Sequence, residues 1–508
     1  MPPGISRRAR RGDDASDGSG STARDRIRAG AGAVLILLAA IAAAYANALE
    51  ASFQFDDWEV IVRDPRVQGL AAWWDAMPGM RPLLKLSYAL NHASGLGVVG
   101  FHAVNVGIHA INALLVMTLA DRLVQRSAPG VEGSSGGAIP GFVARPGFPL
   151  AAALLFALHP LQTEAVTYAS GRSTALSTGF ALASLLLGIA ATDADVDAGR
   201  RRSWLLGASL GAMGLGLAVK ESAVAVPAAL MLWRATDPSR PAGFRDLLRI
   251  SALHWLALFV ALAAALALPA YRHLVATSLA TRTPGENLVA QIHAVLYLLG
   301  QIVRIDRLNA DPALPAITQL DPKGLLGAVV LVAIPVLAVA KRRRAPIAAF
   351  AILWTTLWLL PTNSLLARLD LVNDRQAYGA LVGPALLVAL GLRALAARSR
   401  SGLVLAGLAL VGLCVGLGVA THRRNAVYRD EVVFWKAVIE ASPGNARAFN
   451  NLGIALAARC DEAGAIRAWR QALALDPAFV RAAVNLRLAI EGAAPSSEAD
   501  CPETPISR

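Results

Sequence analysis

The sequence predicts an all-α protein, a polytopic bundle of membrane helices that carries a short helical-repeat domain at its C-terminus. Three observations point to this fold class. Of the 508 residues, 55% are hydrophobic and only 16% are charged, whereas about 25% of the residues of a soluble domain are charged. Apolar runs of about 20 residues, the length that crosses a bilayer, recur along the chain. Near the C-terminus the pattern becomes more polar and repeats with a period of about 34 residues.

The apolar runs predict about eleven membrane-spanning helices, because a segment in lipid must satisfy its own backbone polar groups. The clusters of Lys and Arg between the runs are expected in the cytoplasm, which also places the N-terminus there. A further apolar segment, 288–304, is expected to be re-entrant or interfacial. The predicted spans lie near 30–49, 100–120, 148–160, 174–192, 203–219, 222–234, 251–270, 324–340, 346–361, 376–395 and 403–421.

This topology divides the chain into four regions. Residues 1–29 are expected to be a disordered cytoplasmic tail, because they are rich in Arg, Ser, Gly and Asp. Residues 30–421 form the predicted membrane domain, with 50–99 as its first outer loop. Residues 422–492 form an extracytoplasmic repeat domain, and residues 493–508 a second disordered tail. The predicted location is the inner membrane of a bacterium.

Charge and cysteine content exclude two other classes of protein. The net charge of +13 could indicate a nucleic-acid-binding protein. The basic residues lie in short loops between apolar runs, however, which is the positive-inside pattern, so no nucleic-acid partner is expected. The three cysteines, Cys414, Cys460 and Cys501, are far apart, and one lies in an apolar run. This spacing argues against a disulfide framework and against a cysteine-based metal site.

The C-terminal region fits the pattern of tetratricopeptide repeats, in which an aromatic residue is followed by Leu-Gly, by a second aromatic position and by Pro. An array of fewer than about three repeats is seldom stable alone, so the domain is expected to dock on the membrane domain or on a partner. The full repeat contains Phe449, Leu452, Gly453, Ala465, Trp469, Ala472 and Pro477, and its neighbours contribute Trp435, Pro443, Asn485 and Leu486.

Four charged residues of the first outer loop could carry chemistry. Asp56 and Asp57 directly follow the first predicted span. Such a pair could supply a general base or a metal ligand, or could cap a helix and face solvent. Arg81 and Lys85 share one face of a predicted helix. They could bind phosphate, or their side chains could extend to the lipid headgroups.

Further polar residues accompany the next two spans. His102 opens a row of four polar residues at helical spacing, which could face a cavity or form hydrogen bonds between helices. His159 precedes a proline at the end of the following span, and Glu164 and Arg172 lie in the outer hairpin after it. Glu164 and Arg172 could form an ion pair with each other or bind a ligand.

Two more charged pairs lie at the ends of later spans. Lys220 and Glu221 interrupt an apolar stretch, where an isolated charge costs about 2.5–3.5 kcal/mol on insertion scales. They could pair with each other or contact a lipid phosphate. Asp374 and Arg375 form a polar cluster just outside another span. Because all these loops are predicted on the same side, we expect their polar residues to converge in one cleft at the outer membrane face.

Taken together, these motifs resemble those of the transmembrane and tetratricopeptide-repeat-containing O-mannosyltransferases, and in particular of their bacterial relatives. This family belongs to the GT-C superfamily of polytopic glycosyltransferases. Two features depart from its pattern: residues 309–312 are only loosely similar, and the repeat array is shorter than in the animal members. The resemblance rests on the order of six strings, FDDW at 55–58, RPLLKLSYALN at 81–91, GFHAVNVGIHAINALL at 100–115, LFALHPLQTEAVTYASGRS at 155–173, AVKES at 218–222 and FNNLGIALA at 449–457.

The resemblance implies a GT-C-like bundle and a transfer reaction outside the cytoplasm. The donor would be a polyprenyl-phosphate sugar, a hexose such as mannose, and the acceptor would be a protein hydroxyl group or a glycan held by the repeats. One of the two aspartates of the first outer loop would be the general base. The cations Arg81, Lys85, Arg172 or Lys220 would stabilise the phosphate leaving group in contact with membrane lipid. A divalent metal is optional, and no other cofactor is implied.

Two other functions stay open at the level of sequence. The chain could be a non-enzymatic membrane scaffold whose repeats recruit a partner and whose polar clusters are structural. It could also transport lipid-linked sugars, although a transporter is expected to show an internal repeat among its helices. A scaffold would tolerate the loss of Asp56 and Asp57, whereas an enzyme would not.

Overall fold

The computed structural model describes residues 18–77, 79–127, 147–193, 199–239, 242–363 and 365–491. Within these residues the chain is helical and contains no strand, in agreement with the predicted all-α class. The predicted C-terminal tail, 493–508, lies outside the described residues. So does the predicted N-terminal tail up to residue 17, and helix α1 (Gly18–Ala44) begins within the remainder of that segment.

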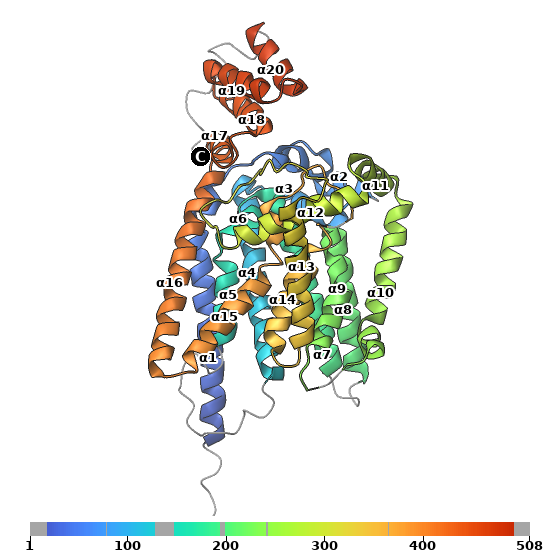
Figure 1. Cartoon of the computed structure of the whole chain (residues 1–508), viewed down its shortest axis with the longest axis vertical. Helices are drawn as coiled ribbons and strands as arrows, with labels where there is room; N and C mark the ends of the chain where they lie inside the picture. Colours follow the sequence, from blue (N-terminus) through green and yellow to red (C-terminus); the bar gives the residue numbers. More distant parts are fainter. Residues whose placement is uncertain are drawn as a thin grey trace, which may run out of the picture.

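A bundle of apolar helices forms most of the described structure (Figure 1). Six helices are long and apolar enough to cross a membrane, and shorter apolar helices accompany them. Each predicted span overlaps a helix, while the number of bilayer crossings stays a prediction. The long helices are α4 (Gly97–Ser127), α7 (Arg172–Asp193), α8 (Gly199–Val219), α10 (Phe244–Ala267), α13 (Pro322–Lys341) and α16 (Arg400–Asn425); the shorter ones include α5 (Gly147–Ala157), α9 (Val226–Ala235), α14 (Pro346–Leu359) and α15 (Val382–Ala396).

The connections at one end of the bundle are themselves folded, and this end also carries the C-terminal helices (Figure 1). We call it the tail-side end. The segment that was predicted to be re-entrant or interfacial is helix α12 (Pro284–Gln301), which lies across this end. The other elements here are η1 (Ala46–Glu50), η2 (Trp58–Val62), η3 (Pro65–Val67), α2 (Leu70–Asp75), α3 (Pro82–Ala93), η4 (Pro160–Gln162), α6 (Thr163–Val166), η5 (Ala169–Gly171), η6 (Glu221–Ala225), α11 (Pro269–Thr281) and η7 (Asp374–Ala377).

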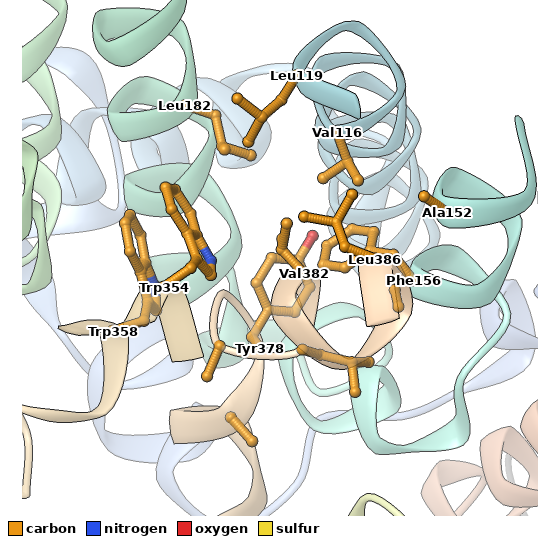
Figure 2. Packing of buried hydrophobic residues seen from close by; sticks show 14 of the residues in the cluster. Val116, Leu119, Ala152, Phe156, Leu182, Trp354, Trp358, Tyr378, Val382 and Leu386 are labelled. Carbon is orange, nitrogen blue, oxygen red and sulfur yellow. The ribbon is translucent and has the colours of Figure 1, made fainter. Parts of the chain in front are cut away.

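Close approach between α14 and the start of α15 builds the centre of the bundle. Figure 2 shows Trp354 and Trp358 of α14 beside Tyr378, and the two indole rings stack with their centroids 4.6 Å apart. A Cβ atom at Gly379 would lie only 1.8 Å from Nε1 of Trp358, so no residue other than glycine fits there. Small residues at such crossings allow apolar helices to pack by van der Waals contact, the main attraction available in lipid.

The polar row of α4 is fully buried and bonded to other elements. His109 Nδ1 lies 2.8 Å from the hydroxyl of Tyr378, and the Asn112 amide donates to the carbonyl of Ala175 over 2.7 Å. The amide of Asn105 donates to the carbonyl of Val166 over 3.1 Å. The row therefore forms hydrogen bonds between helices, one of the two alternatives that the sequence left open.

Four helices follow the bundle and form the C-terminal tail, joined to α16 by η8 (Ala426–Tyr428). Trp469 is buried in the tail, and its indole N–H donates to the carbonyl of Asn450 over 3.1 Å. Phe449, which the repeat pattern predicts in the core, is only half-buried. The assignment of these helices to tetratricopeptide repeats stays a prediction. The helices are α17 (Glu431–Ala441), α18 (Ala446–Ala457), α19 (Glu462–Leu475) and α20 (Val480–Ile490).

The cysteines differ from the sequence-based expectation. Cys460, between α18 and α19, is disulfide-bonded, whereas Cys414 in α16 is a free thiol. The argument against any disulfide is therefore wrong for Cys460. A disulfide requires two Cα atoms within about 7 Å, which separation in the sequence does not reveal.

We predict that Trp469→Ala unfolds the tail and leaves the bundle inserted. Removal of a buried Trp costs about 3–5 kcal/mol, which is a large fraction of the stability of a domain this small. Limited proteolysis of the purified protein should then release the tail while the membrane domain stays intact. The exposed neighbour Arg470→Ala is the matched control. Equal protease resistance of the two variants would contradict the packing described above.

Candidate active site

A small pocket at the tail-side end collects polar residues from widely separated parts of the chain. Its acidic and basic groups come from the first outer loop, from α6, from η7 and from the loops that carry Asp311 and Asp370, and its far wall comes from the tail. This arrangement brings together several of the residues that the sequence predicted to converge. The lining residues are Phe55, Asp56, Glu164, Tyr168, Ala310, Asp311, Asp370, Val372, Asn373, Arg375, Tyr428 and Phe434.

Asp56 presents its carboxylate to this pocket. Its side chain is 40% exposed, and Oδ2 lies 3.5 Å from Nη2 of Arg375. Its backbone N–H donates to the hydroxyl of Tyr168 over 2.9 Å. The preceding residue, Phe55, has a φ of 40°, a left-handed conformation that is uncommon for a bulky side chain. The carboxylate thus stands at a sharp turn, near a cation and accessible from the pocket.

Asp57, the next residue, does not line the pocket. It is fully buried and accepts hydrogen bonds from the backbone N–H groups of Ser170, over 2.7 Å, and Gln54, over 3.0 Å. Burial raises the pKa of this carboxyl to about 7, although the two N–H donors oppose the rise. Asp57 therefore ties the first outer loop to the turn 169–171, which is a structural task.

Arg375 links Asp56 to Glu164, a buried carboxylate in the outer hairpin that follows the predicted span 148–160. Its backbone N–H donates to Glu164 Oε2 over 3.0 Å, its Nε lies 3.8 Å from Glu164 Oε1, and its guanidinium lies 5.4 Å from the centre of the Tyr168 ring. Burial raises the pKa of Glu164 to about 7, opposed by the charge of Arg375. The neighbouring Asp374 is buried and accepts from the backbone N–H of Asn309, and burial also raises its pKa.

A group of cations lies close to Arg375. Lys220 is buried and donates to the hydroxyl of Thr174 over 2.6 Å. Burial lowers its pKa, and the charges of Arg368, Arg375 and Arg81 lower it further. Burial and the charges of Arg375 and Arg81 likewise lower the pKa of Arg368. We call Arg81, Lys220, Arg368 and Arg375 the cation group.

The cation group contains one residue that sequence reasoning missed. Arg368 is not part of any motif, yet its Nη1 is buried and has no hydrogen-bond partner among the described residues. Glu221 was considered as a partner of Lys220, but it pairs with Arg81, whose Nη2 lies 2.8 Å from Glu221 Oε2. Arg81 itself has a left-handed backbone, with a φ of 52°. The cation group therefore has fewer close carboxylate partners than cations.

Several residues that the sequence predicted in the site lie outside both the pocket and the cation group. Arg172 does not pair with Glu164; its guanidinium donates to Asn105 Oδ1 over 2.6 Å and to the carbonyls of Ser87 and Phe101. His102 contacts the carbonyl of Ala51. The reason in both cases is burial, because a polar group without water must find a protein partner.

His159 and Lys85 also have structural partners. Nε2 of His159 lies 2.9 Å from the carbonyl oxygen of Ile302, and Nδ1 accepts the backbone N–H of Leu161. Both ring nitrogens of His159 therefore have partners within the protein. Lys85 Nζ lies 3.5 Å from Asp64 Oδ2 in the first outer loop. Among the described residues no group of three or more His, Cys, Asp or Glu is arranged to hold a metal ion.

We predict that Arg375→Met destabilises the protein in a pH-dependent way. The change leaves Glu164 buried without its cation, and breaking a buried pair costs about 3–5 kcal/mol. Because burial raises the pKa of Glu164, the native state holds the proton more tightly than the unfolded state, and stability falls as pH rises from about 5 to 8. Thermal denaturation in detergent should therefore show a larger loss at pH 8 than at pH 5. Glu164→Gln in the same background should remove this difference; an equal loss at both pH values would contradict the pairing.

Comparison with known proteins gives relatives in one family. No family model and no solved structure matches the chain. Protein O-mannosyl-transferase Tmtc2 of Drosophila melanogaster is 31% identical over 198 residues, which are 35% of this chain and 19% of that protein. Human protein O-mannosyl-transferase TMTC2 is 30% identical over 200 residues, 36% of this chain and 22% of that protein.

A second human protein, protein O-mannosyl-transferase TMTC1, is 30% identical over 150 residues, 26% of this chain and 15% of its own length. The chain therefore spans about a fifth of the length of the curated relatives it matches. These relatives all carry the family name that the motifs of the first outer loop and its neighbours had indicated. Over the matched part of its sequence, the chain is related to the TMTC protein O-mannosyl-transferases.

Proposed function

We propose that this chain is a membrane glycosyltransferase that moves a hexose such as mannose from a polyprenyl-phosphate carrier to an acceptor hydroxyl group. The observation that carries the proposal is the position of Asp56, a partly exposed carboxylate in a pocket beside Arg375, one member of the cation group. The names of the relatives support a glycosyltransferase. The donor, the sugar and the acceptor are our proposals.

Asp56 is the better candidate for the general base. A base must come within about 2.6–3.2 Å of the proton it removes, which requires a carboxylate that an acceptor can reach. Asp56 is accessible from the pocket, whereas Asp57 is fully buried and already accepts two backbone hydrogen bonds. Asp56 would take the proton of the acceptor hydroxyl as its oxygen attacks the anomeric carbon.

The cation group would stabilise the leaving group. As the bond between the anomeric carbon and the phosphate oxygen breaks, negative charge develops on the polyprenyl phosphate. Fixed cations aimed at developing charge are among the strongest contributions to catalysis. Arg368 has a buried N–H-bearing nitrogen without a partner in the part of the chain that the structure describes. Arg81 and Arg375 have planar guanidinium groups that suit phosphate oxygens. Direct displacement in this arrangement inverts the configuration at the anomeric carbon.

We further propose that the pocket and the tail face the outside of the cytoplasm, with the N-terminus inside, in the inner membrane of a bacterium. The start of α1 lies at the opposite end of the bundle from the tail (Figure 1), and the basic clusters at 341–344 and 393–400 follow the positive-inside pattern. The disulfide of Cys460 supports this orientation, because disulfides persist in oxidising compartments.

We predict that Asp56→Asn lowers transfer by about 10²–10⁴-fold, the usual contribution of a general base. The substitution keeps the shape of the side chain and removes its basicity. The assay supplies purified protein with a labelled polyprenyl-phosphate hexose and an acceptor with hydroxyl groups, and follows label leaving the lipid. The control is Asp306→Asn, a similarly conservative change of an exposed carboxylate that does not line the pocket. Wild-type turnover by Asp56→Asn would refute the catalytic assignment and favour a scaffold.

We predict that a membrane-impermeant thiol reagent labels Cys460 from the extracytoplasmic side after reduction. Reduction is needed because Cys460 is disulfide-bonded. Cys414, which lies in a predicted span, should stay unlabelled in intact cells and serves as the internal control. Labelling of Cys460 in inverted vesicles but not in intact cells would reverse the proposed orientation.

A further inference from the structure

The tail forms one wall of the candidate active site. Tyr428, in the connection from α16, and Phe434, in α17, line the pocket together with Asp56 and Arg375. Both aromatic residues are buried, although they belong to the part of the chain that projects from the bundle. The tail is therefore part of the site and not only a domain tethered near it.

Polar contacts fasten the tail over the pocket. Arg447 of α18 forms ion pairs with Asp311 and with Asp370, the latter over 2.8 Å, and both carboxylates line the pocket. The hydroxyl of Ser442 accepts from the amide of Asn309 over 2.7 Å. These contacts join α17 and α18 to the loops 309–311 and 370, which belong to the membrane domain. We call them the tail–loop contacts.

An aromatic contact connects the tail to the residue before Asp56. The ring of Phe55 packs edge-on against Trp435 of α17, with centroids 5.2 Å apart. On another side the guanidinium of Arg447 lies 5.5 Å from the centre of the same ring. Phe55 has the left-handed backbone described above, which costs of order 1–3 kcal/mol and persists only when its surroundings enforce it. The docked tail supplies these surroundings.

The pocket is small in this arrangement. The free space within it is about 10 Å³, which is roughly the minimum for a single water molecule. A hexose with a hydroxyl-bearing acceptor cannot enter such a space. Part of the wall must therefore move before transfer. The tail is held in place by the ion pairs of Arg447, whose side chain is 38% exposed, and by an apolar contact of Phe434 and Trp435 with the loops of the membrane domain.

We propose that the C-terminal tail is a lid: it moves off the pocket to admit the acceptor and, when docked, holds Asp56 in position through Phe55. Arg447 and Phe55 are positioning residues in this scheme. Opening solvates Asp311 and Asp370 and releases the left-handed turn at Phe55, so Asp56 is placed for transfer only when the tail has closed again over the bound acceptor. The catalytic half of this inference rests on the proposed transfer function, but the opening of the lid does not.

The first test locks the lid. Asn309→Cys with Ser442→Cys replaces two side chains whose polar atoms lie 2.7 Å apart, so oxidation should close a disulfide between tail and loop. We expect the oxidised double variant to lose transfer to a protein acceptor by at least about tenfold and to regain it on reduction. The two single-cysteine variants and the wild type, treated alike, control for reduction of the native disulfide. Full transfer by the locked protein would overturn the proposal.

The second test measures opening without any transfer reaction. Ala310→Cys places a thiol in the wall of the pocket, and its rate of reaction with a thiol reagent reports how often the lid opens. Removing Arg447 leaves the buried carboxylate of Asp311 without its cation in the closed state, with only the amide of Asn445 among the described residues still donating to it. Arg447→Ala should therefore speed the reaction by about tenfold. The matched control is Arg487→Ala, which removes an exposed ion pair on α20.

The two tests separate the failure of the lid from the failure of the proposed function. If the wild type transfers no sugar but Arg447→Ala still speeds labelling of the thiol introduced by Ala310→Cys, the proposed lid is supported and the proposed transferase function is not. If the Arg447→Ala and Arg487→Ala variants react with the thiol reagent at the same rate, the proposal of a lid is wrong, even if the protein transfers sugar. Labelling of the protein without Ala310→Cys gives the background from the native cysteines.

Discussion

The contacts of Arg375 hold the candidate site together. Its side chain reaches Asp56 of the first outer loop and Glu164 of the outer hairpin that follows the predicted span 148–160. It also lies over the ring of Tyr168. Three loops that are far apart in the sequence thus meet at one guanidinium. Because this group is largely removed from water, the carboxylates must stay near it, and the cost of an unpaired buried charge makes the arrangement rigid. The pocket, the orientation of Asp56 and the position of the cation group all depend on this meeting point.

The same physical constraint explains which predicted residues became structural. A polar side chain inside a membrane bundle must find a partner in the protein. His102, Asn105 and Arg172 find theirs in backbone carbonyls and in each other. These contacts fix the positions of α4, α7 and the outer hairpin that contains Glu164 relative to one another. At the tail-side end, where the loops leave the bundle, Arg368 keeps a buried nitrogen without a hydrogen-bond partner among the described residues, and a substrate could become its partner.

Much of the fold follows from the sequence. The long apolar runs predict the helices because lipid-spanning segments have few other solutions, and each predicted span overlaps a helix of the structure. The pairs within the site were less predictable. Glu164 was considered as a partner of Arg172 or of a ligand and is found beside Arg375. Glu221 was considered as a partner of Lys220 and is found beside Arg81. Proximity in the sequence favoured the nearer partner, whereas the packing of distant loops decided the real one.

The sequence alone determined the all-α class, the apolar bundle with a helical tail, and the relationship to the O-mannosyl-transferases, because periodicity and motif order are properties of the chain itself. It also placed two carboxylates side by side, but it could not rank them. The tertiary structure decided that Asp56 faces the pocket while Asp57 is buried against Ser170 and Gln54. The physical reason is the tight left-handed turn at Phe55, which the tail packs against. Such a turn directs neighbouring side chains to opposite sides, and it is enforced by contacts from nearly four hundred residues away in the chain.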